Sequence, residues 1–290
     1  MELWLVYALL ASLLAGVTAV LAKVGIKGVN SHLATAVRTV VIVVFSWGMV
    51  FSFGSHLELA NVSGRTWIFL AASGLATGAS WLCFFYALKF GSVSNVTPLK
   101  KSSTVLTIIL AFLILGEPAG LPEILGIVFI IAGTLIMLEK KDGSKGKSEG
   151  GGNWLLLGIL AAVFASLVTI FGAIGIADVN ADLGNAIRVV VVLIVSWGMV
   201  FFTGKQGGIK DISKKSWAFL ALSGLATGGS WLFFFRALQI GPVSAIVPID
   251  KLSIIFNILF ACLFLREKQS LKRVAGLACL VIGTLVLVIW

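Results

Sequence analysis

Charged side chains occur inside two of the most apolar stretches of the chain. The first stretch, "SNVTPLKKSSTVLTIILAFLILG" at residues 94–116, contains Lys100 and Lys101 ahead of a nearly unbroken apolar run. The second, "SAIVPIDKLSIIFNILFACLFLR" at residues 244–266, has Asp250 and Lys251 at the same places. Charges inside a membrane segment are costly, and where they persist they commonly mark solute or ion pathways. These residues are therefore the first candidates for a functional site.

Helical spacing groups further polar residues with these charges, because positions i, i+3 and i+7 of a helix share one face. The two aligned stripes consist of Lys100, Ser103 and Thr107, and of Asp250, Ser253 and Asn257. Two matching polar stripes on otherwise apolar helices predict a cavity between the two halves of the chain. Lys101 and Lys251 lie beside the stripes, and the excess of lysine favours solutes that carry a carboxylate.

The charges also have structural interpretations. Lys100 and Lys101 lie about 10 Å from the expected start of their helix, so their long side chains can extend to the headgroup region instead of lining a cavity. Aspartate is too short to do this, and Asp250 is the only carboxylate that we expect inside a membrane span. Its structural alternative is an ion pair with a nearby basic residue such as Lys100.

Two prolines precede these charges and predict hinges. Pro98 and Pro248 lack an N–H, so each leaves the carbonyl four residues earlier, of Ser94 and Ser244, without its helical donor. In lipid such a carbonyl needs a partner or a water-lined cavity. The alternative is a simple kink in which neighbouring Ser or Thr side chains satisfy the carbonyl.

Two arginines and two tryptophans complete the candidate set. Arg38 in "TAVRTVV" and Arg188 in "NAIRVVV" lie near the starts of two apolar runs, and we assign them a structural or gating role rather than substrate contact. Trp81 and Trp231 follow "SGLATGAS" and "SGLATGGS", whose glycines allow close helix packing. Each tryptophan can line the cavity or can pack between helices.

Composition identifies the class of protein. The 290 residues are 59% hydrophobic and 12% charged, whereas soluble domains are about 45–50% apolar and about 25% charged. The net charge of +10 falls mostly in short gaps between apolar runs, so it indicates membrane topology and not nucleic-acid binding. Because the spans contain no Ser/His constellation or metal-ligand spacing, we expect no enzyme activity, no metal and no cofactor.

Apolar runs of about 18–23 residues, each long enough to cross a bilayer as a helix, recur along the chain. The expected spans are 3–22, 33–52, 67–88, 93–115, 121–138, 154–172, 184–202, 217–238, 243–265 and 270–290. Between the fifth and sixth lies "EKKDGSKGKSEGGGN", residues 139–153, which is charged and rich in Gly and Ser and predicts a flexible linker. The fold class is an all-α polytopic membrane protein with ten transmembrane helices.

The two halves repeat each other at a shift of 150 positions without a gap. "SWGMVF" at 46–51 returns at 196–201, Arg38 aligns with Arg188, and Pro98 aligns with Pro248. The chain therefore contains a duplicated five-helix unit, with one repeat at 1–138, the linker at 139–153 and the second repeat at 154–290. An odd number of spans in each unit predicts that the second repeat is inverted in the membrane.

Loop charges give the expected orientation. Nearly all loop Lys and Arg fall on the side shared by the linker, and the opposite side has Arg65 and, at a span end, Arg236. By the positive-inside rule the linker is cytoplasmic and both termini are external, in the plasma (inner) membrane.

The chain resembles a known family in these features. The duplicated five-span unit, the proline of the fourth and ninth spans, and "LGE" at 115–117 are similar to the drug/metabolite transporter superfamily, and most of all to its EamA-type branch. The resemblance covers essentially the whole chain and implies a basket of ten helices around a central cavity. Two departures are "LRE" at 265–267 and a first helix without the embedded Glu of the small multidrug branch, which argues against export of lipophilic cations by that mechanism.

These patterns predict a secondary active transporter for a small-molecule solute, because inverted repeats with interrupted helices are a recurrent architecture of such carriers. We expect export of small polar metabolites such as amino acids or organic acids, with protons as a candidate coupling ion. Asp250, near Lys100 or Lys251, would switch between ion-paired and protonated states. Two alternatives stay open, namely a membrane scaffold subunit that transports nothing and a flippase for an anionic lipid-linked metabolite.

Overall fold

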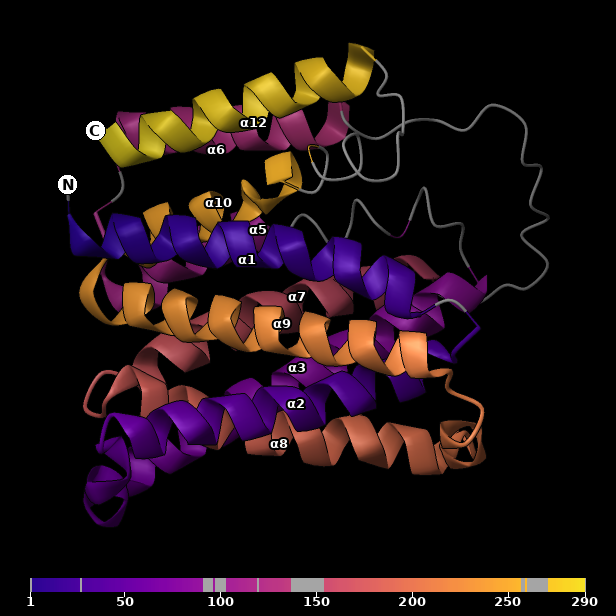
Figure 1. Ribbon diagram of the computed structural model, residues 1–290. Coiled ribbons are helices and arrows are strands. Elements are labelled where there is room, and N and C mark those ends of the chain that lie inside the picture. The colour runs from indigo at the N-terminus through magenta and orange to yellow at the C-terminus, as the bar shows by residue number, and fades with distance from the viewer. Residues whose placement is uncertain are drawn as a thin grey trace. The chain divides into compact units, whose positions relative to one another are not determined.

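The computed structural model describes residues 2–26, 28–90, 96, 103–118, 120–136, 154–256, 259 and 271–289, and within these ranges the chain is helical with no strand. Its helices are labelled in Figure 1. The α-helices are α1 (Leu3–Gly25), α2 (Ser31–Ser52), α3 (Gly64–Phe90), α5 (Ser103–Leu110), α6 (Leu121–Ile136), α7 (Trp154–Gly175), α8 (Ala181–Phe202), α9 (Lys214–Ile240), α10 (Val243–Lys251) and α12 (Leu271–Ile289). Short 3-10 helices are η1 (Ser55–Asn61) and η3 (Gln206–Ile209), and η2 (Ala111–Leu115) is a π-helical turn after α5.

Several helices begin at side-chain caps that repeat in both halves. Asn30 accepts the backbone N–H of His32 at 3.0 Å at the start of α2, and Asn180 accepts that of Asp182 at 2.9 Å at the start of α8. Ser213 accepts the N–H of Ser216 at 3.1 Å at the start of α9. Such caps satisfy amide donors that the first helical turn leaves without partners. The duplicated sequence therefore starts corresponding helices in the same way.

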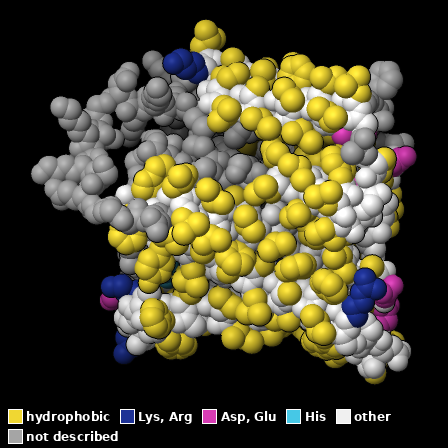
Figure 2. Space-filling model, turned by 180° about the vertical axis from the view of Figure 1, so that it is seen from behind, with side chains coloured by type: hydrophobic (Ala, Val, Ile, Leu, Met, Phe, Trp, Pro, Cys, Tyr) yellow, Lys and Arg dark blue, Asp and Glu magenta, His cyan; other side chains and the backbone are white. Residues whose placement is uncertain are grey.

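Six described helices are long and apolar enough to cross a bilayer, namely α1, α2, α3, α7, α8 and α9, and shorter apolar helices cover 103–115, 123–133 and 274–287. Large apolar side chains on their surfaces remain exposed, with Val44 68% and Phe202 86% exposed. Figure 2 shows one face on which hydrophobic side chains dominate and the few charged ones lie near the margins. An apolar outer surface suits lipid tails and not water. The protein is a polytopic membrane protein.

The chain forms two compact units. The first comprises Met1–Leu75, Phe171–Gly241 and Ser253–Glu267, and the second comprises Ala76–Ile170, Pro242–Leu252 and Lys268–Trp290. Each unit contains segments from both repeats. Neither repeat is therefore compact by itself, because its helices pack against helices of the other copy.

Contacts in the first unit are reciprocal. In α1, a Cβ built on Gly25 would lie 3.0 Å from the backbone N of Leu220 on α9, and in α7 one built on Gly175 would lie 3.2 Å from that of Leu70 on α3. These two pairs are related by the shift of 150 positions. When two residues of different repeats touch and their counterparts in the opposite repeats touch as well, the repeats are related by a two-fold axis.

The second unit has the same reciprocity between α6 and α12, which lie side by side in Figure 1. A Cβ built on Gly133 would lie 2.6 Å from the carbonyl oxygen of Gly276, and one built on Gly283 would lie 2.8 Å from that of Gly126. The paired glycines of the last span in each repeat thus let the two backbones approach closely, as small residues do between membrane helices.

Counterpart helices run antiparallel in each unit. In the first, Leu33, Ala34 and Val37 near the start of α2 pack with Val200 near the end of α8. In the second, the glycine contacts pair the early part of α6 with the late part of α12. Two membrane-crossing helices that run antiparallel enter the bilayer from opposite sides. The two repeats are therefore inverted relative to each other, as the odd number of spans predicts.

Candidate functional site

The expected ninth span is interrupted beside its charges. Helix α10 contains Pro248 and ends at Lys251, and after a turn at Leu252 the residues 253–256 are helical again. At the turn, the N–H of Leu252 donates to the carbonyl of Ile249, three residues earlier, at 2.9 Å. In an α-helix the acceptor would be four residues earlier, so the backbone is wound more tightly at this point. Discontinuous helices of this kind form the solute and ion sites of many secondary transporters.

Asp250 and Lys251 form an ion pair immediately before this turn. Nζ of Lys251 lies 3.2 Å from Oδ2 of Asp250. The side chain of Lys251 is 39% exposed and that of Asp250 is 22% exposed. Of the basic partners expected for Asp250, the structure places Lys251 beside it. Lys100, Lys101, Pro98 and Asn257 lie outside the described residues, so a pairing of Asp250 with Lys100 stays a prediction.

The polar stripe of the fourth span is partly described. Ser103 begins α5 and is half-buried, whereas Thr107 is 2% exposed and donates its hydroxyl to the carbonyl of Ser103 at 2.8 Å. Helix α5 packs against α10, so this stripe belongs to the same unit as Asp250. Ser253 is half-buried and follows the turn at Leu252.

Glu117 fixes the start of the helix that carries Asp250. Gly116 has φ of 70°, a left-handed conformation that glycine adopts readily, and it ends the fourth span. The Glu117 carboxylate that follows accepts the N–H of Val243 at 2.6 Å through Oε1 and that of Ser244 at 2.9 Å through Oε2. A carboxylate is favourable there because a helix N-terminus has free N–H groups and a positive partial charge. The "LGE" motif, which identified only a family likeness in the sequence, thus has a structural role.

In the first unit, Arg188 is buried among polar and aromatic groups. It is 3% exposed, and its Nε donates to Oγ of Ser73 at 3.1 Å. Its guanidinium lies over the rings of Trp231 and Phe235, at 4.7 and 5.1 Å from their centroids. Cation–π contacts stabilise a desolvated guanidinium. Trp231 therefore packs against Arg188, whereas Trp81 is half-buried and its role stays a prediction.

Arg38, the counterpart of Arg188, has a different environment. Its Nη2 donates to Oγ1 of Thr227 at 2.7 Å. The hydroxyl of Thr227 donates in turn to the carbonyl of Ser223 at 2.7 Å and lies 3.3 Å from that of Thr18 on α1. The two arginines thus occupy equivalent sequence positions but only Arg188 is enclosed by aromatic rings in the described contacts.

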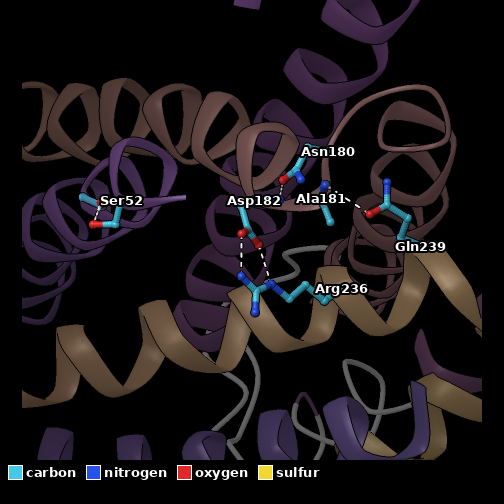
Figure 3. A network of polar contacts seen from close by, with 7 residues as sticks. Ser52, Asn180, Ala181, Asp182, Arg236 and Gln239 are labelled. Carbon is cyan, nitrogen blue, oxygen red and sulfur yellow. Dashed lines mark hydrogen bonds and ion pairs between the residues drawn. The ribbon is translucent and has the colours of Figure 1, made fainter. Parts of the chain in front are cut away.

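A second ion pair joins α8 to α9. Arg236 donates through Nε to Oδ1 and through Nη2 to Oδ2 of Asp182, at 2.7 and 2.6 Å, and Asp182 is 5% exposed. Close by, Gln239 donates to the carbonyls of Ile176 and Val179 at 3.0 and 2.7 Å and accepts from the N–H of Ala181 at 3.2 Å. Figure 3 shows this network at the loop between α7 and α8.

The expectation that Asp250 is the only carboxylate inside a span was wrong, because the span expected at 121–138 contains Glu123 and α8 contains Asp182. Helix α8 begins at Ala181 rather than at residue 184, so Asp182 belongs to its first turn. Asp182 and Arg236 align with His32 and Tyr86 in the first half, so the repeat carried no signal for this pair. The available signal was Asn180, a good helix cap, placed just before the apolar run.

Asn185 lies on α8, between Asp182 and Arg188 in the sequence. It is 0% exposed, and neither atom of its amide has a partner among the described residues. Leaving a buried polar group unpaired costs about 1–3 kcal/mol. We therefore expect an ordered water or a polar group of a solute at Asn185.

Comparisons with known proteins agree with this architecture. A model of the EamA-like transporter family matches the chain twice, over residues 2–139 and 152–289. A protein named an uncharacterized transporter in the cobO 3′ region, from a Sinorhizobium species, is 48% identical over 134 residues, which are 46% of this chain and 95% of that protein. Solute carrier family 35 member G1 of Homo sapiens is 24% identical over 226 residues, 74% of this chain and 60% of that protein.

A solved crystal structure shares the fold. It superimposes with a TM-score of 0.81 at 16% sequence identity and covers 98% of this chain and 96% of its own. At this identity the likeness concerns the fold alone. The family pattern, in contrast, matches both repeats and nearly every residue, so the chain belongs to the EamA-like transporter family.

Proposed function

We propose that this membrane transporter is a secondary active carrier that exports small polar metabolites bearing a carboxylate, such as amino acids or organic acids, by alternating access and in exchange for protons. The observation that carries the proposal is the Asp250–Lys251 ion pair at the point where α10 ends inside the ninth span. Family membership and the inverted repeats support the class of mechanism.

The chemistry of the proposal rests on competition for Asp250. While Lys251 lies 3.2 Å away, the carboxylate has an ion-pair partner. When the helices rearrange and this partner moves off, a proton replaces it. Glu117 keeps the beginning of α10 anchored, so the change is confined to the end of that helix, next to the turn at Leu252. Lys100, Lys101, Ser103 and Thr107 complete the proposed cavity, Trp81 lines it, and Pro98 and Pro248 act as its hinges.

The proposed setting follows the loop charges. The repeats are residues 1–138 and 154–290, the linker 139–153 is cytoplasmic, and both termini are external in the plasma (inner) membrane. The sequence predicts a structural or gating role for Arg38 and Arg188, and the enclosure of Arg188 by Trp231 and Phe235 supports that role for Arg188.

The test is transport by the purified protein in liposomes. Labelled alanine, glutamate, malate and citrate are tested for counterflow exchange and for accumulation driven by a pH gradient. We expect Asp250→Asn to abolish gradient-driven accumulation while some counterflow exchange remains. Asp211→Asn, at an exposed loop carboxylate, is the matched control and should leave both activities unchanged.

Two results would contradict the proposal. Accumulation by Asp250→Asn with the wild-type pH dependence would show that the charge is structural. Absence of exchange with every solute would favour a scaffold subunit, or a flippase if an anionic lipid-linked probe crosses the bilayer instead.

A further inference from the structure

Arg38 is a cation inside a membrane span whose only described hydrogen-bond partner is a neutral hydroxyl. It lies seven residues into α2, about 10 Å from the start of that helix. Its described polar partner is Thr227, and among the described residues no carboxylate forms an ion pair with it. A charged residue at such depth is expensive to insert, costing about 2.5–3.5 kcal/mol at a helix centre, and usually faces a partner or an aqueous cavity.

One donor of this guanidinium is left over. The Nε atom of Arg38 is buried and has no hydrogen-bond partner among the described residues. Arg236 of the same protein shows what such an edge can hold, because its Nε and Nη2 together bind both oxygens of Asp182. Paired donors of this geometry match a carboxylate. Nη2 of Arg38 already donates to Thr227, so the unused Nε indicates an acceptor that the described residues do not supply.

Neutral groups around Arg38 lie at the middle of the membrane spans. Thr227 is at the centre of the 27-residue helix α9, about 20 Å from either end. Its hydroxyl hydrogen is used by the carbonyl of Ser223, so it accepts from Arg38, and Thr18 on α1 lies 3.3 Å away. The hydrogen shared in that contact is therefore the one of Thr18, and the contact is long enough that Thr18 can turn this hydrogen to a bound anion instead. Helices α1 and α2 together supply one positive charge and one hydroxyl that can exchange Thr227 for a solute acceptor.

The counterpart arginine shows that this arrangement is not a requirement of the fold. Arg188 occupies the same position of the second repeat, yet it is 3% exposed and covered by Trp231 and Phe235. The two copies have therefore diverged, with one arginine enclosed by aromatic rings and the other, half-buried, bonded to Thr227. Divergence between duplicated copies is expected where only one copy meets the solute.

We propose that Arg38, Thr18 and Thr227 form a binding site for the carboxylate of the transported solute, at mid-depth in the first unit. A single guanidinium with one hydroxyl donor, that of Thr18, complements a group with one negative charge, which favours a carboxylate over a doubly charged phosphate ester. The inference rests on the proposed transport function for the solute, but the site itself can be tested without transport.

The experiment measures charge selectivity at position 18. In a background with Cys83, Cys262 and Cys279 replaced by serine, Thr18→Cys is treated with two thiosulfonates, one bearing a sulfonate and one a trimethylammonium group. The ratio of the two rates is divided by that of a small free thiol. We expect the anionic reagent to be favoured about tenfold, because the guanidinium lies nearby in a medium of low dielectric constant.

Substitutions of Arg38 then assign the effect. Arg38→Gln should return the ratio to that of the free thiol, whereas Arg38→Lys should preserve most of it. Arg65→Gln, which removes an exposed guanidinium at the start of α3, is the matched control and should leave the ratio unchanged. Succinate should slow the labelling and succinamide should not. If Thr18→Cys does not fold, Thr227→Cys is the second reporter.

Each outcome decides the inference. Labelling with no charge preference, a preference unaffected by Arg38→Gln, or no labelling by either reagent would overturn the site. If the preference depends on Arg38 but liposomes exchange none of the tested solutes, the anion site stands and the proposed transport function fails. If the liposomes exchange solutes and the preference does not depend on Arg38, the function stands and this site fails.

Discussion

Asp182 is held by two short hydrogen bonds from Arg236 while almost completely buried, so that one guanidinium balances its charge. Taking two charges out of water is expensive, and the pair repays that expense only while it is intact. Its repeat counterparts, His32 and Tyr86, offer no such pair of opposite charges. The second repeat therefore contains an ion pair between α8 and α9 whose residue types do not occur at the equivalent positions of the first repeat.

Removing one member of this pair should be worse than removing both. Arg236→Met leaves Asp182 charged and buried, and we expect a loss of about 3 kcal/mol in the free energy of unfolding in detergent micelles. The double variant Asp182→Leu with Arg236→Met should recover most of that loss, since no charge is left unpaired. Arg65→Met, at an exposed arginine, should change stability by less than about 0.5 kcal/mol. Equal losses for the single and double variants would contradict this account.

At the scale of elements, Glu117 links two helices that are far apart in sequence. It follows the end of the fourth span and accepts two N–H groups at the start of α10. The position of Asp250 at the end of α10 is therefore set in part by a residue 133 positions earlier. Glycines also determine how helices are placed, because they set the distances between neighbouring helices.

Glu117→Gln should loosen the start of α10. A lost cap of this kind costs about 1 kcal/mol, so we expect hydrogen exchange of the amides of Val243 and Ser244 to accelerate about fivefold. Mass spectrometry of the peptide covering 242–246 measures the change. Glu123→Gln is the matched control, because Glu123 accepts the N–H of Gly120 at 2.7 Å and caps α6 instead. Unchanged exchange at 242–246 in Glu117→Gln would show that the cap is dispensable.

Glycine substitutions should separate close contacts from open positions. A Cβ built on Gly224 would lie 2.8 Å from Cβ of Val41, whereas one built on Gly48 meets nothing within 4 Å. Gly224→Ala should therefore lower the free energy of unfolding by about 1–3 kcal/mol through overpacking. Gly48→Ala should raise it by about 0.5–1 kcal/mol, because alanine loses less backbone entropy in a helix. A similar result for both variants in thermal unfolding would contradict this packing.

At the scale of the molecule, inversion requires that the two repeats enter the membrane from opposite sides. The antiparallel counterparts α2 with α8 and α6 with α12 meet that requirement in each unit. Which side is cytoplasmic depends on loop charges, which act during insertion and leave no trace in the packing of the helices.

Cysteine labelling tests this orientation. In the background without natural cysteines, Glu2→Cys should react with a membrane-impermeant maleimide in intact cells, because the N-terminus is predicted to be external. Gly146→Cys, in the linker, should react only after permeabilisation. Neither site lies within a span, so accessibility reports the side of the membrane. Labelling of both positions from the same side would refute the predicted topology.

Most of the fold could be predicted from local and repeated patterns in the sequence. Apolar length determined the spans, and the shift of 150 positions determined the duplication, because both depend only on neighbouring residues or on the comparison of the chain with itself. The odd number of spans and the charge bias then required inversion. The pairing of Asp250 with Lys251 was also within reach of the sequence, since the two residues are adjacent.

Only the tertiary structure decided which distant residues meet. Asp182 with Arg236, Glu117 with the start of α10, and Arg38 with Thr227 are contacts between separate helices. Periodicity assigns a residue to a helix face but says nothing about which helix lies opposite, or at what depth. Arg38 and Arg188 have the same position in the repeat, and it was packing against different side chains that made one enclosed and the other a candidate for binding an anion.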